Sequence, residues 1–263
     1  MTGDAPIGMF DSGVGGLAVL AELAHIAPFE PILYVADQRH APYGERTLAE
    51  VAARSIQITG QLVEAGAKMV VVACNSASAA ALIPLREAYP ATPIVGMEPA
   101  VKPAVEWSHT GVVGVLATSA TFQGTLFASL VDRHGGGATI VPIVGTGLAD
   151  LVERGERDGP AAKEALAVLL SPHLDAGMDT LVLGCTHYSF LTPAIASVAG
   201  EQLAVVDPCG PVAQQVMRRL QAEGAQRPGP DPIAPRYATT GDPEWFATQL
   251  AALLDEEAAP IKW

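Results

Sequence analysis

The chain of 263 residues has no uninterrupted apolar stretch of the roughly 18–20 residues that a membrane-spanning helix needs. It is also poor in basic residues, since 15 lysines and arginines stand against 28 acidic residues and give a formal charge of −13. A general affinity for nucleic acid or an anionic membrane is therefore not expected. Residues 1–6 lack the basic start and apolar block of a signal peptide, so we expect no export and a cytoplasmic location.

Cysteine is scarce as well, with three copies in the whole sequence. A small odd number in a chain without an export signal argues against a disulfide framework. Cys209, within the run 206–211, is interpreted as a buried structural thiol.

The other two cysteines, Cys74 and Cys185, stand in matching settings. Each ends an apolar run, 69–73 or 180–184, and is followed by small polar residues that open a predicted helix. A strand that delivers a thiol to a helix start places it where backbone N–H groups and the positive helix end favour a thiolate. Two such thiols predict a pair of acid/base groups that face one substrate.

Short apolar runs alternate with longer amphipathic segments, which predicts an α/β fold with mainly parallel sheets flanked by helices. The hydrophobic share of 49% is enough for a sizeable core. The predicted strands are 7–10, 31–36, 69–73, 94–97, 111–116, 138–142, 180–184, 203–206 and 236–240. The predicted helices are 15–26, 48–65, 77–89, 121–133, 160–176, 188–198, 210–223 and 243–254.

A faint internal repeat relates residues 8–12 to residues 114–118 in type and position. The first segment precedes Cys74 by about as much sequence as the second precedes Cys185. The repeat therefore predicts two similar α/β lobes with one cysteine each.

The predicted boundaries of these lobes follow from the same pattern. The first lobe comprises residues 1–97 plus 208–263, and the second comprises residues 98–207. The stretch 226–232, rich in proline and glycine, is predicted to be an extended surface connection.

The run 7–10 followed by 13–18 fits the strand–GxGxx(G/A)–helix pattern of dinucleotide-binding folds. Asp37 ends the second predicted strand, where an acidic residue would bind a ribose hydroxyl. Asp11 and Ser12 argue against this function, because a carboxylate at the strand end would repel a pyrophosphate. We favour a turn that presents Asp11, Ser12 and backbone amides to a small ligand.

Four short motifs, in order and at these spacings, resemble those of the glutamate racemase family: Asp11-Ser12-Gly13-Val14-Gly15-Gly16-Leu17, Pro42-Tyr43-Gly44, Ala73-Cys74-Asn75-Ser76-Ala77-Ser78-Ala79 and Leu183-Gly184-Cys185-Thr186-His187-Tyr188. The resemblance runs from about residue 7 to about residue 220. It implies an enzyme that interconverts L- and D-glutamate, the latter needed for peptidoglycan, with its active site between two α/β lobes. It also implies activity without pyridoxal phosphate, nucleotide or metal, and a homodimer.

The resemblance carries over to individual positions. Cys74 and Cys185 match the two catalytic thiols, and Asp11, Glu153 and His187 match assisting polar residues. The matching substrate-binding set is Asp11, Ser12, Tyr43, Gly44, Asn75, Ser76, Thr118, Thr121, Thr186 and His187. The chain departs from common family choices at Ser76, Ser189 and Gly145-Thr146.

Two thiols suit this chemistry, because racemisation removes an α-proton from one face and returns a proton to the other. One thiol acts as thiolate while its partner is protonated, and by resemblance Cys185 deprotonates L-glutamate while Cys74 deprotonates D-glutamate. A cysteine pKa of about 8.5 can be lowered by a helix N-terminus towards working pH. No lysine lies in a clear cofactor motif, although a Schiff-base lysine stays open.

Other readings of single residues also stay open. Asp11 can serve as a helix N-cap, and Glu153 can be a solvated helix end. No arginine lies inside a motif, so a substrate carboxylate is expected to bind helix N-terminal amides and hydroxyl groups. Tyr43-Gly44 is expected to lie in a loop that closes over the site, with an ordinary turn as the alternative.

Three alternative functions deserve comparison. The nearest is a racemase of the same two-cysteine group that acts on aspartate or a related acid. A two-lobed amino-acid binding protein would bind glutamate without turnover and would not need two thiols. A thiol–disulfide oxidoreductase is disfavoured because neither cysteine belongs to a CxxC motif.

Overall fold

The computed structural model of the chain describes residues 3–229 and 231–263. Its strands are β1 (Ile7–Asp11), β2 (Ile32–Ala36), β3 (Met69–Val72), β4 (Ile94–Val95), β5 (Val112–Ala117), β6 (Thr139–Val144), β7 (Thr180–Gly184), β8 (Ala204–Val206), β9 (Arg236–Thr239) and β10 (Ile261–Lys262). Its α-helices are α1 (Leu17–Ile26), α2 (Leu48–Glu64), α3 (Asn75–Ala88), α4 (Val101–Trp107), α5 (Ser119–Gln123), α6 (Thr125–His134), α7 (Leu148–Glu153), α8 (Pro160–Asp175), α9 (Thr192–Ala199), α10 (Cys209–Ala222) and α11 (Pro243–Leu254). Short 3₁₀ helices are η1 (Gln38–His40), η2 (Tyr43–Glu45), η3 (Thr186–Leu191) and η4 (Gly200–Gln202). None of the helices in the described ranges combines the length and hydrophobicity needed to cross a membrane.

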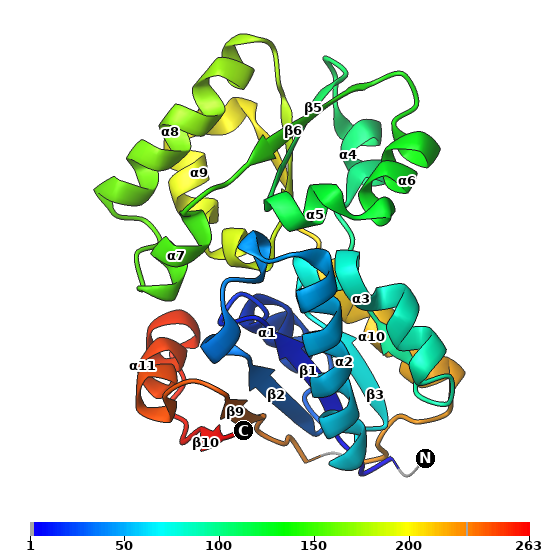
Figure 1. The fold of residues 1–263 in the computed structure, drawn as a ribbon. Coiled ribbons are helices and arrows are strands. Elements are labelled where there is room, and N and C mark those ends of the chain that lie inside the picture. The colour runs from blue at the N-terminus through cyan, green and yellow to red at the C-terminus, as the bar shows by residue number, and fades with distance from the viewer. Residues whose placement is uncertain (1–2, 230) are drawn as a thin grey trace.

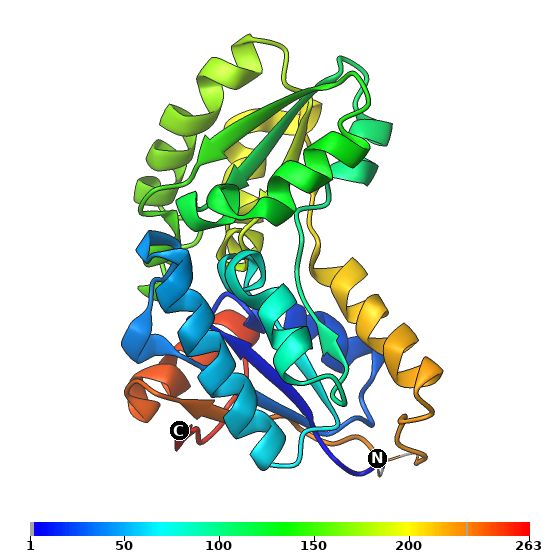
Figure 2. The same ribbon diagram turned by 45° about the vertical axis from the view of Figure 1, so that its right-hand side comes forward.

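The strands form two sheets in two lobes, one above the other in Figure 1 and again in the turned view of Figure 2. The first lobe contains the six-stranded sheet β10-β9-β2-β1-β3-β4, and the second lobe contains the four-stranded sheet β6-β5-β7-β8. Every pairing between these strands is parallel. The predicted fold class is confirmed.

Both sheets are covered on two faces, as expected for strands that are apolar without alternation. Side chains along a strand point to alternate faces, so Ile7 and Met9 of β1 join the core under α1, α10 and α11. Phe10, one residue on, joins the opposite core under α2 and α3. In the second lobe, Leu116 packs with α8 and α9, whereas Val115 packs with α4 and α6.

The strand order β6-β5-β7-β8 of the second lobe repeats the order β2-β1-β3-β4 of the first. The strands β1 and β5 thus hold equivalent positions, and so do β3 and β7, which precede the two cysteines. The internal repeat predicted from residues 8–12 and 114–118 therefore appears in the topology.

One predicted helix is divided in two. The predicted helix 121–133 breaks at Gly124 into α5 and α6, and Gly124 itself is extended. A Cβ at residue 124 would lie 2.8 Å from the Cβ of Ala79, so glycine lets this junction approach α3. The helix breaks where the two lobes are in contact, and the local sequence gives no sign of that contact.

The predicted helix 188–198 also differs. The chain after Cys185 first forms the 3₁₀ helix η3 and becomes α-helical only at Thr192. The elements α4, α7 and β10 have no counterpart among the predicted ones. The described residues of the predicted connection 226–232 carry neither helix nor strand, while Pro230 lies outside the described residues.

Parallel strands place their carboxyl ends at one edge of each sheet, where ligands bind in open α/β sheets. The edge of the first lobe carries Asp11 at the end of β1 and Cys74 just after β3. The edge of the second lobe carries Thr118 just after β5 and Cys185 just after β7. The fold thus gathers residues that are far apart in sequence at two edges.

Asp179 joins the starts of β5 and β7. Its carboxylate accepts hydrogen bonds from Ser108 Oγ at 2.6 Å and from the backbone N–H groups of His109 and Thr110 at 2.7 and 2.8 Å. Burial opposes its charge, but these hydrogen bonds, led by that of Ser108, hold the pKa of Asp179 below its usual range.

We expect Asp179→Ala to lower the free energy of unfolding by about 1 kcal/mol near neutral pH, measured by urea denaturation. The folded-state pKa is depressed, so this contribution is complete above the unfolded pKa of about 3.9 and disappears as pH falls through the folded value. The stabilities of variant and parent should converge in acid. A difference that does not shrink in acid would contradict this role.

Candidate active site

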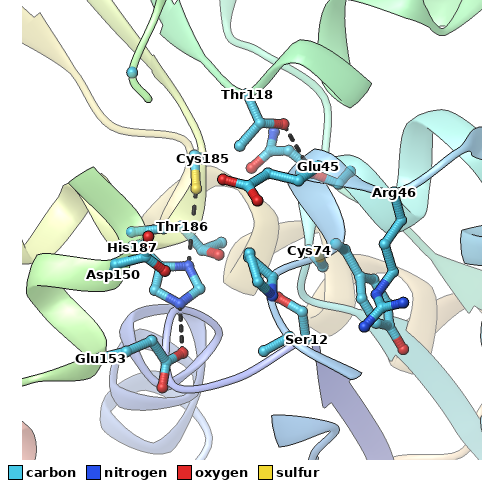
Figure 3. Close-up of a pocket in the computed structure, with 18 of the residues that line it drawn as sticks. Ser12, Glu45, Arg46, Cys74, Thr118, Asp150, Glu153, Cys185, Thr186 and His187 are labelled. Carbon is cyan, nitrogen blue, oxygen red and sulfur yellow. Dashed lines mark hydrogen bonds and ion pairs between the residues drawn. The ribbon is translucent and has the colours of Figure 1, made fainter. Parts of the chain in front are cut away.

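A cleft of about 700 Å³ lies between the two edges, with walls from both lobes (Figure 3). Most residues predicted for the site line it: Ser12, Tyr43, Gly44, Cys74, Asn75, Ser76, Thr118, Glu153, Cys185, Thr186 and His187. Among the described residues predicted for the site, Asp11 and Thr121 lie behind the wall. The arrangement brings both cysteines to one cavity.

Cys74 connects β3 to α3 as the N-cap residue of that helix, and its Sγ accepts a hydrogen bond from the Ala77 N–H at 3.5 Å. The thiol is 5% exposed. Burial raises the pKa of Cys74 well above its usual value, and the nearby Asp11 carboxylate and Cys185 raise it further. The prediction that the helix start lowers this pKa is therefore wrong, because burial and negative neighbours outweigh the single N–H donor.

Asp11 is fully buried behind Cys74. Its Oδ2 accepts hydrogen bonds from the N–H groups of Gly16 at 2.9 Å and Gly13 at 3.3 Å. The carboxylate thus holds the turn between β1 and α1 and places a negative charge near the Cys74 thiol. Asp11 is thus near a thiol, as the sequence suggested, but it is not the helix N-cap considered there, because the N-cap residue of α1 is Gly16.

Cys185 begins a hydrogen-bonded row of three side chains that line the cleft. Its Sγ lies 3.8 Å from His187 Nδ1, and His187 Nε2 lies 2.7 Å from Glu153 Oε1. Figure 3 shows the three side chains in a row, joined by dashed lines. Glu153 ends α7 with its side chain 22% exposed and directed into this row, so it is not a solvated helix end.

The charges along this row support one another. Burial disfavours a charged imidazole, but the hydrogen bonds with Cys185 and Glu153 outweigh it and raise the pKa of His187 well above its usual value. Burial likewise opposes a charged Glu153, but the His187 hydrogen bond outweighs it and lowers the pKa of Glu153. The positively charged form of His187 is thus favoured between the Glu153 carboxylate and Cys185.

The glycines of the turn after β1 serve the contact between lobes. A Cβ at residue 13 would overlap the Glu153 carboxylate, and a Cβ at residue 15 would overlap the His187 ring. The N–H group of Val14 donates to Glu153 Oε1 at 2.9 Å. The GxGxx(G/A) pattern therefore reflects the close approach of Glu153 and His187. Of the turn predicted to present Asp11, Ser12 and backbone amides to a small ligand, Ser12 lines the cleft, whereas the amides donate to the carboxylates of Asp11 and Glu153.

Asp37, the residue compared with a ribose-binding acid, is occupied by protein groups. Its carboxylate accepts from Arg54 Nε at 2.7 Å, Tyr43 OH at 2.5 Å and Thr240 Oγ1 at 2.8 Å. Burial opposes its charge, but the Arg54 hydrogen bond leads a set that lowers the pKa of Asp37. The Tyr43 ring is thereby fixed over the cleft. Gly44 follows it, and a Cβ there would lie 2.7 Å from Thr118 Cβ.

Polar groups from both lobes meet at one end of the cleft. Ser76 Oγ lies 2.9 Å from Thr118 Oγ1, which lies 3.1 Å from Thr121 Oγ1. The side-chain oxygen and nitrogen of Asn75 are buried and have no hydrogen-bond partner within the described chain. A buried amide without partners is costly, so Asn75 is a candidate to bind a polar ligand.

Several residues near the cleft were missed by sequence reasoning. Arg46 lines it two residues after Gly44, so an arginine is present near the predicted closing loop. Asp37 and Arg54 support Tyr43 from behind, and Gln249 contacts Glu153 from α11. Their positions depend on long-range packing, and only Arg46 has a nearby motif that could have indicated it.

Cys209 is buried at the start of α10, with its Sγ 3.3 Å from Ser189 Oγ. This agrees with the predicted structural thiol. Within the ranges that the structure describes, no group of three or more His, Cys, Asp or Glu side chains is arranged to hold a metal ion.

Comparison with known proteins identifies the family. A family model described as Asp/Glu/hydantoin racemase matches residues 8–216. The glutamate racemase of Pseudomonas putida KT2440 is 47% identical over 249 residues, which cover 95% of this chain and 94% of that protein.

Solved structures agree. The Thermus thermophilus glutamate racemase, in complex with β-chloro-D-alanine, has a TM-score of 0.86 at 36% identity and covers 99% of this chain and 97% of its own. The Escherichia coli glutamate racemase, in complex with L-glutamate and the activator UDP-MurNAc-ala, has a TM-score of 0.84 at 30% identity, with coverages of 98% and 97%. The chain belongs to the Asp/Glu/hydantoin racemase family.

Proposed function

We propose that this enzyme interconverts L-glutamate and D-glutamate by proton transfer between two cysteines. The observation that carries the proposal is the meeting of Cys74 and Cys185, from equivalent positions of two lobes, at one cleft. The 47% identity to a curated glutamate racemase over nearly the whole chain supports glutamate as the substrate.

In the direction from L to D, the Cys185 thiolate removes the α-proton of L-glutamate. The Cys74 thiol then gives its proton to the opposite face of the resulting carbanion. The product is D-glutamate, Cys74 is left as the thiolate and Cys185 as the thiol. The reverse direction exchanges the two roles, so each reaction needs one base and one acid.

The surroundings suit this starting state. The high pKa of Cys74 keeps it protonated and ready to act as an acid, while His187, whose raised pKa favours its positive form, lies beside the Cys185 sulfur. The imidazolium is in turn held by Glu153. The Asp11 charge favours return of a proton to Cys74 after each donation.

The substrate is proposed to bind with its carboxylates at the helix starts of both lobes. Cys74 and Thr118 are N-cap residues of α3 and α5. Backbone N–H groups at such positions suit anions. Ser12, Asn75, Ser76 and Thr186 supply further polar groups, with Thr121 supporting Thr118 and Tyr43-Gly44 covering the cleft.

The wider setting follows from this function. We propose that the enzyme supplies D-glutamate for peptidoglycan in the cytoplasm, needs no pyridoxal phosphate, nucleotide or metal, and forms a homodimer. The lobe boundaries at 97/98 and 207/208 stay a prediction.

Incubation in deuterated water tests the reaction. We expect L-glutamate to lose optical rotation and to gain deuterium at Cα, because the proton returned comes from a thiol that exchanges with solvent. L-Aspartate in a parallel sample should react far more slowly. Faster exchange of aspartate would favour the aspartate racemase alternative, and glutamate binding without exchange would favour a binding protein.

A further inference from the structure

Gln249 contacts the Cys185 row from outside the cleft. It lies on α11 and is 3% exposed. Its Nε2 donates to the Glu153 carbonyl oxygen at 2.7 Å and to Glu153 Oε2 at 3.1 Å. One amide thus holds both the backbone and the carboxylate of Glu153.

The direction of this amide is determined by its neighbours. A backbone carbonyl can only accept, so Nε2 of Gln249 must face Glu153. On the other side, Gln249 Oε1 accepts from Gln38 Nε2 at 2.5 Å, and Gln38 Oε1 accepts from Thr239 Oγ1 at 2.8 Å. The amide nitrogens of Gln249 and Gln38 thus both face acceptors, which gives Gln249 one orientation.

The contacts of Glu153 cross the interface between lobes. Glu153 belongs to the second lobe, as do His187 and Cys185, which it serves. Its other hydrogen-bond donors, the Val14 N–H group and the Gln249 amide, both come from the first lobe. The carboxylate behind Cys185 is therefore positioned by the lobe that carries Cys74.

We propose that Gln249 is a positioning residue for the Cys185 base, acting through Glu153 and His187. This inference rests on the proposed function, in which Cys185 acts as a base. Loss of the amide removes two hydrogen bonds from Glu153, which loosens the carboxylate and weakens its hold on the imidazolium. The imidazolium beside Cys185 is then held less firmly, and the Cys185 sulfur is less well placed.

The effect should be confined to one thiol. The neighbours that influence Cys74 are Asp11, the Ala77 N–H group and Cys185. In the described residues, Asp11 and the Ala77 N–H group form no hydrogen bond with Gln249, and Gln249 is linked to Cys185 only indirectly, through Glu153 and His187. Substitution of Gln249 is therefore expected to impair proton removal by Cys185 more than proton removal by Cys74. A merely structural residue would weaken both.

The test uses Gln249→Leu, which keeps similar size without hydrogen-bonding groups, and Thr248→Val as the matched control. Thr248 lies beside Gln249 on α11 and is exposed, and its hydroxyl donates to the Glu244 carbonyl oxygen of the same helix. Gln249→Met serves as a second variant if the leucine variant does not fold.

The first readout is chloride release from the enantiomers of a glutamate that carries chloride at Cβ. Removal of the α-proton expels the chloride, so each enantiomer needs one base only. We expect release from the L-analogue to fall by about 10- to 100-fold and release from the D-analogue to change by less than about twofold. Equal losses for both enantiomers, or no loss, would overturn the proposal.

The second readout does not depend on catalysis. Alkylation of each cysteine by iodoacetamide is followed by mass spectrometry across pH. In Gln249→Leu, the alkylation profile of Cys185 should move to higher pH while that of Cys74 stays in place. An unmoved Cys185 profile would refute the role of Gln249. Failure of the unmodified enzyme to process either analogue would instead refute the proposed function.

Discussion

Serine at position 74 will abolish racemisation yet leave proton removal from the L-enantiomer intact, and serine at position 185 will do the reverse. A serine hydroxyl keeps the hydrogen bonding of a thiol but is a far weaker acid. Racemisation needs both groups, so each variant should lose about 10²- to 10⁴-fold in rate. With the chlorinated analogues, Cys74→Ser should process the L-form and Cys185→Ser the D-form.

Cys209→Ser is the matched control for this pair. That thiol is buried against Ser189 at the start of α10 and does not line the cleft, so racemisation should persist. If Cys74→Ser and Cys185→Ser handled the same enantiomer equally well, the assignment of one base to each face would be wrong.

The second large effect is expected at a residue without a side chain. In Gly13→Ala the new methyl group would overlap the Glu153 carboxylate, which lies on the other lobe. Either the carboxylate moves from His187 or the lobes move apart, and both outcomes misplace Cys185 relative to Cys74. We expect kcat/KM to fall by about 100-fold or more, since displacements near 1 Å have costs of this size.

Gly159→Ala provides the control, because a Cβ at residue 159 would meet nothing within 4 Å and its backbone needs no special conformation. Activity and thermal unfolding of both variants should be measured together. Full activity of Gly13→Ala would show that catalysis does not depend on the close approach of the Glu153 carboxylate to this turn.

The sequence predicted those features of the site that depend on local pattern. An apolar run, then a cysteine, then small polar residues placed Cys74 and Cys185 at strand ends, and the two similar runs before them predicted the repeated lobes. The parallel sheets followed from the alternation of strands and helices. These features can be predicted from the sequence because each depends on residues that are close together in the sequence.

Features that depend on distant contacts were not predicted. Gln249 and Glu153 are 96 positions apart, and Asp37 and Thr240 are 203 apart, so no local pattern relates them. The pKa of Cys74 was expected to fall, because a helix start is visible in the sequence while complete burial beside Asp11 is not. The glycines of the first turn were recognised, but their close contact with Glu153 and His187 of the second lobe was not predicted.

The unequal surroundings of the two thiols have a thermodynamic consequence. Cys185 has an imidazolium beside it, whereas Cys74 has a carboxylate, so the resting enzyme is prepared for one enantiomer. Enantiomers have equal free energies in water, and their equilibrium constant is unity. The ratio kcat/KM must therefore be identical in both directions, whatever the side chains are.

The asymmetry can appear only as matched differences in kcat and in KM, with tighter apparent binding of one enantiomer offset by its slower turnover. No substitution in the cleft can make the enzyme a one-way catalyst. The direction of net conversion belongs to whichever reaction consumes one of the two enantiomers.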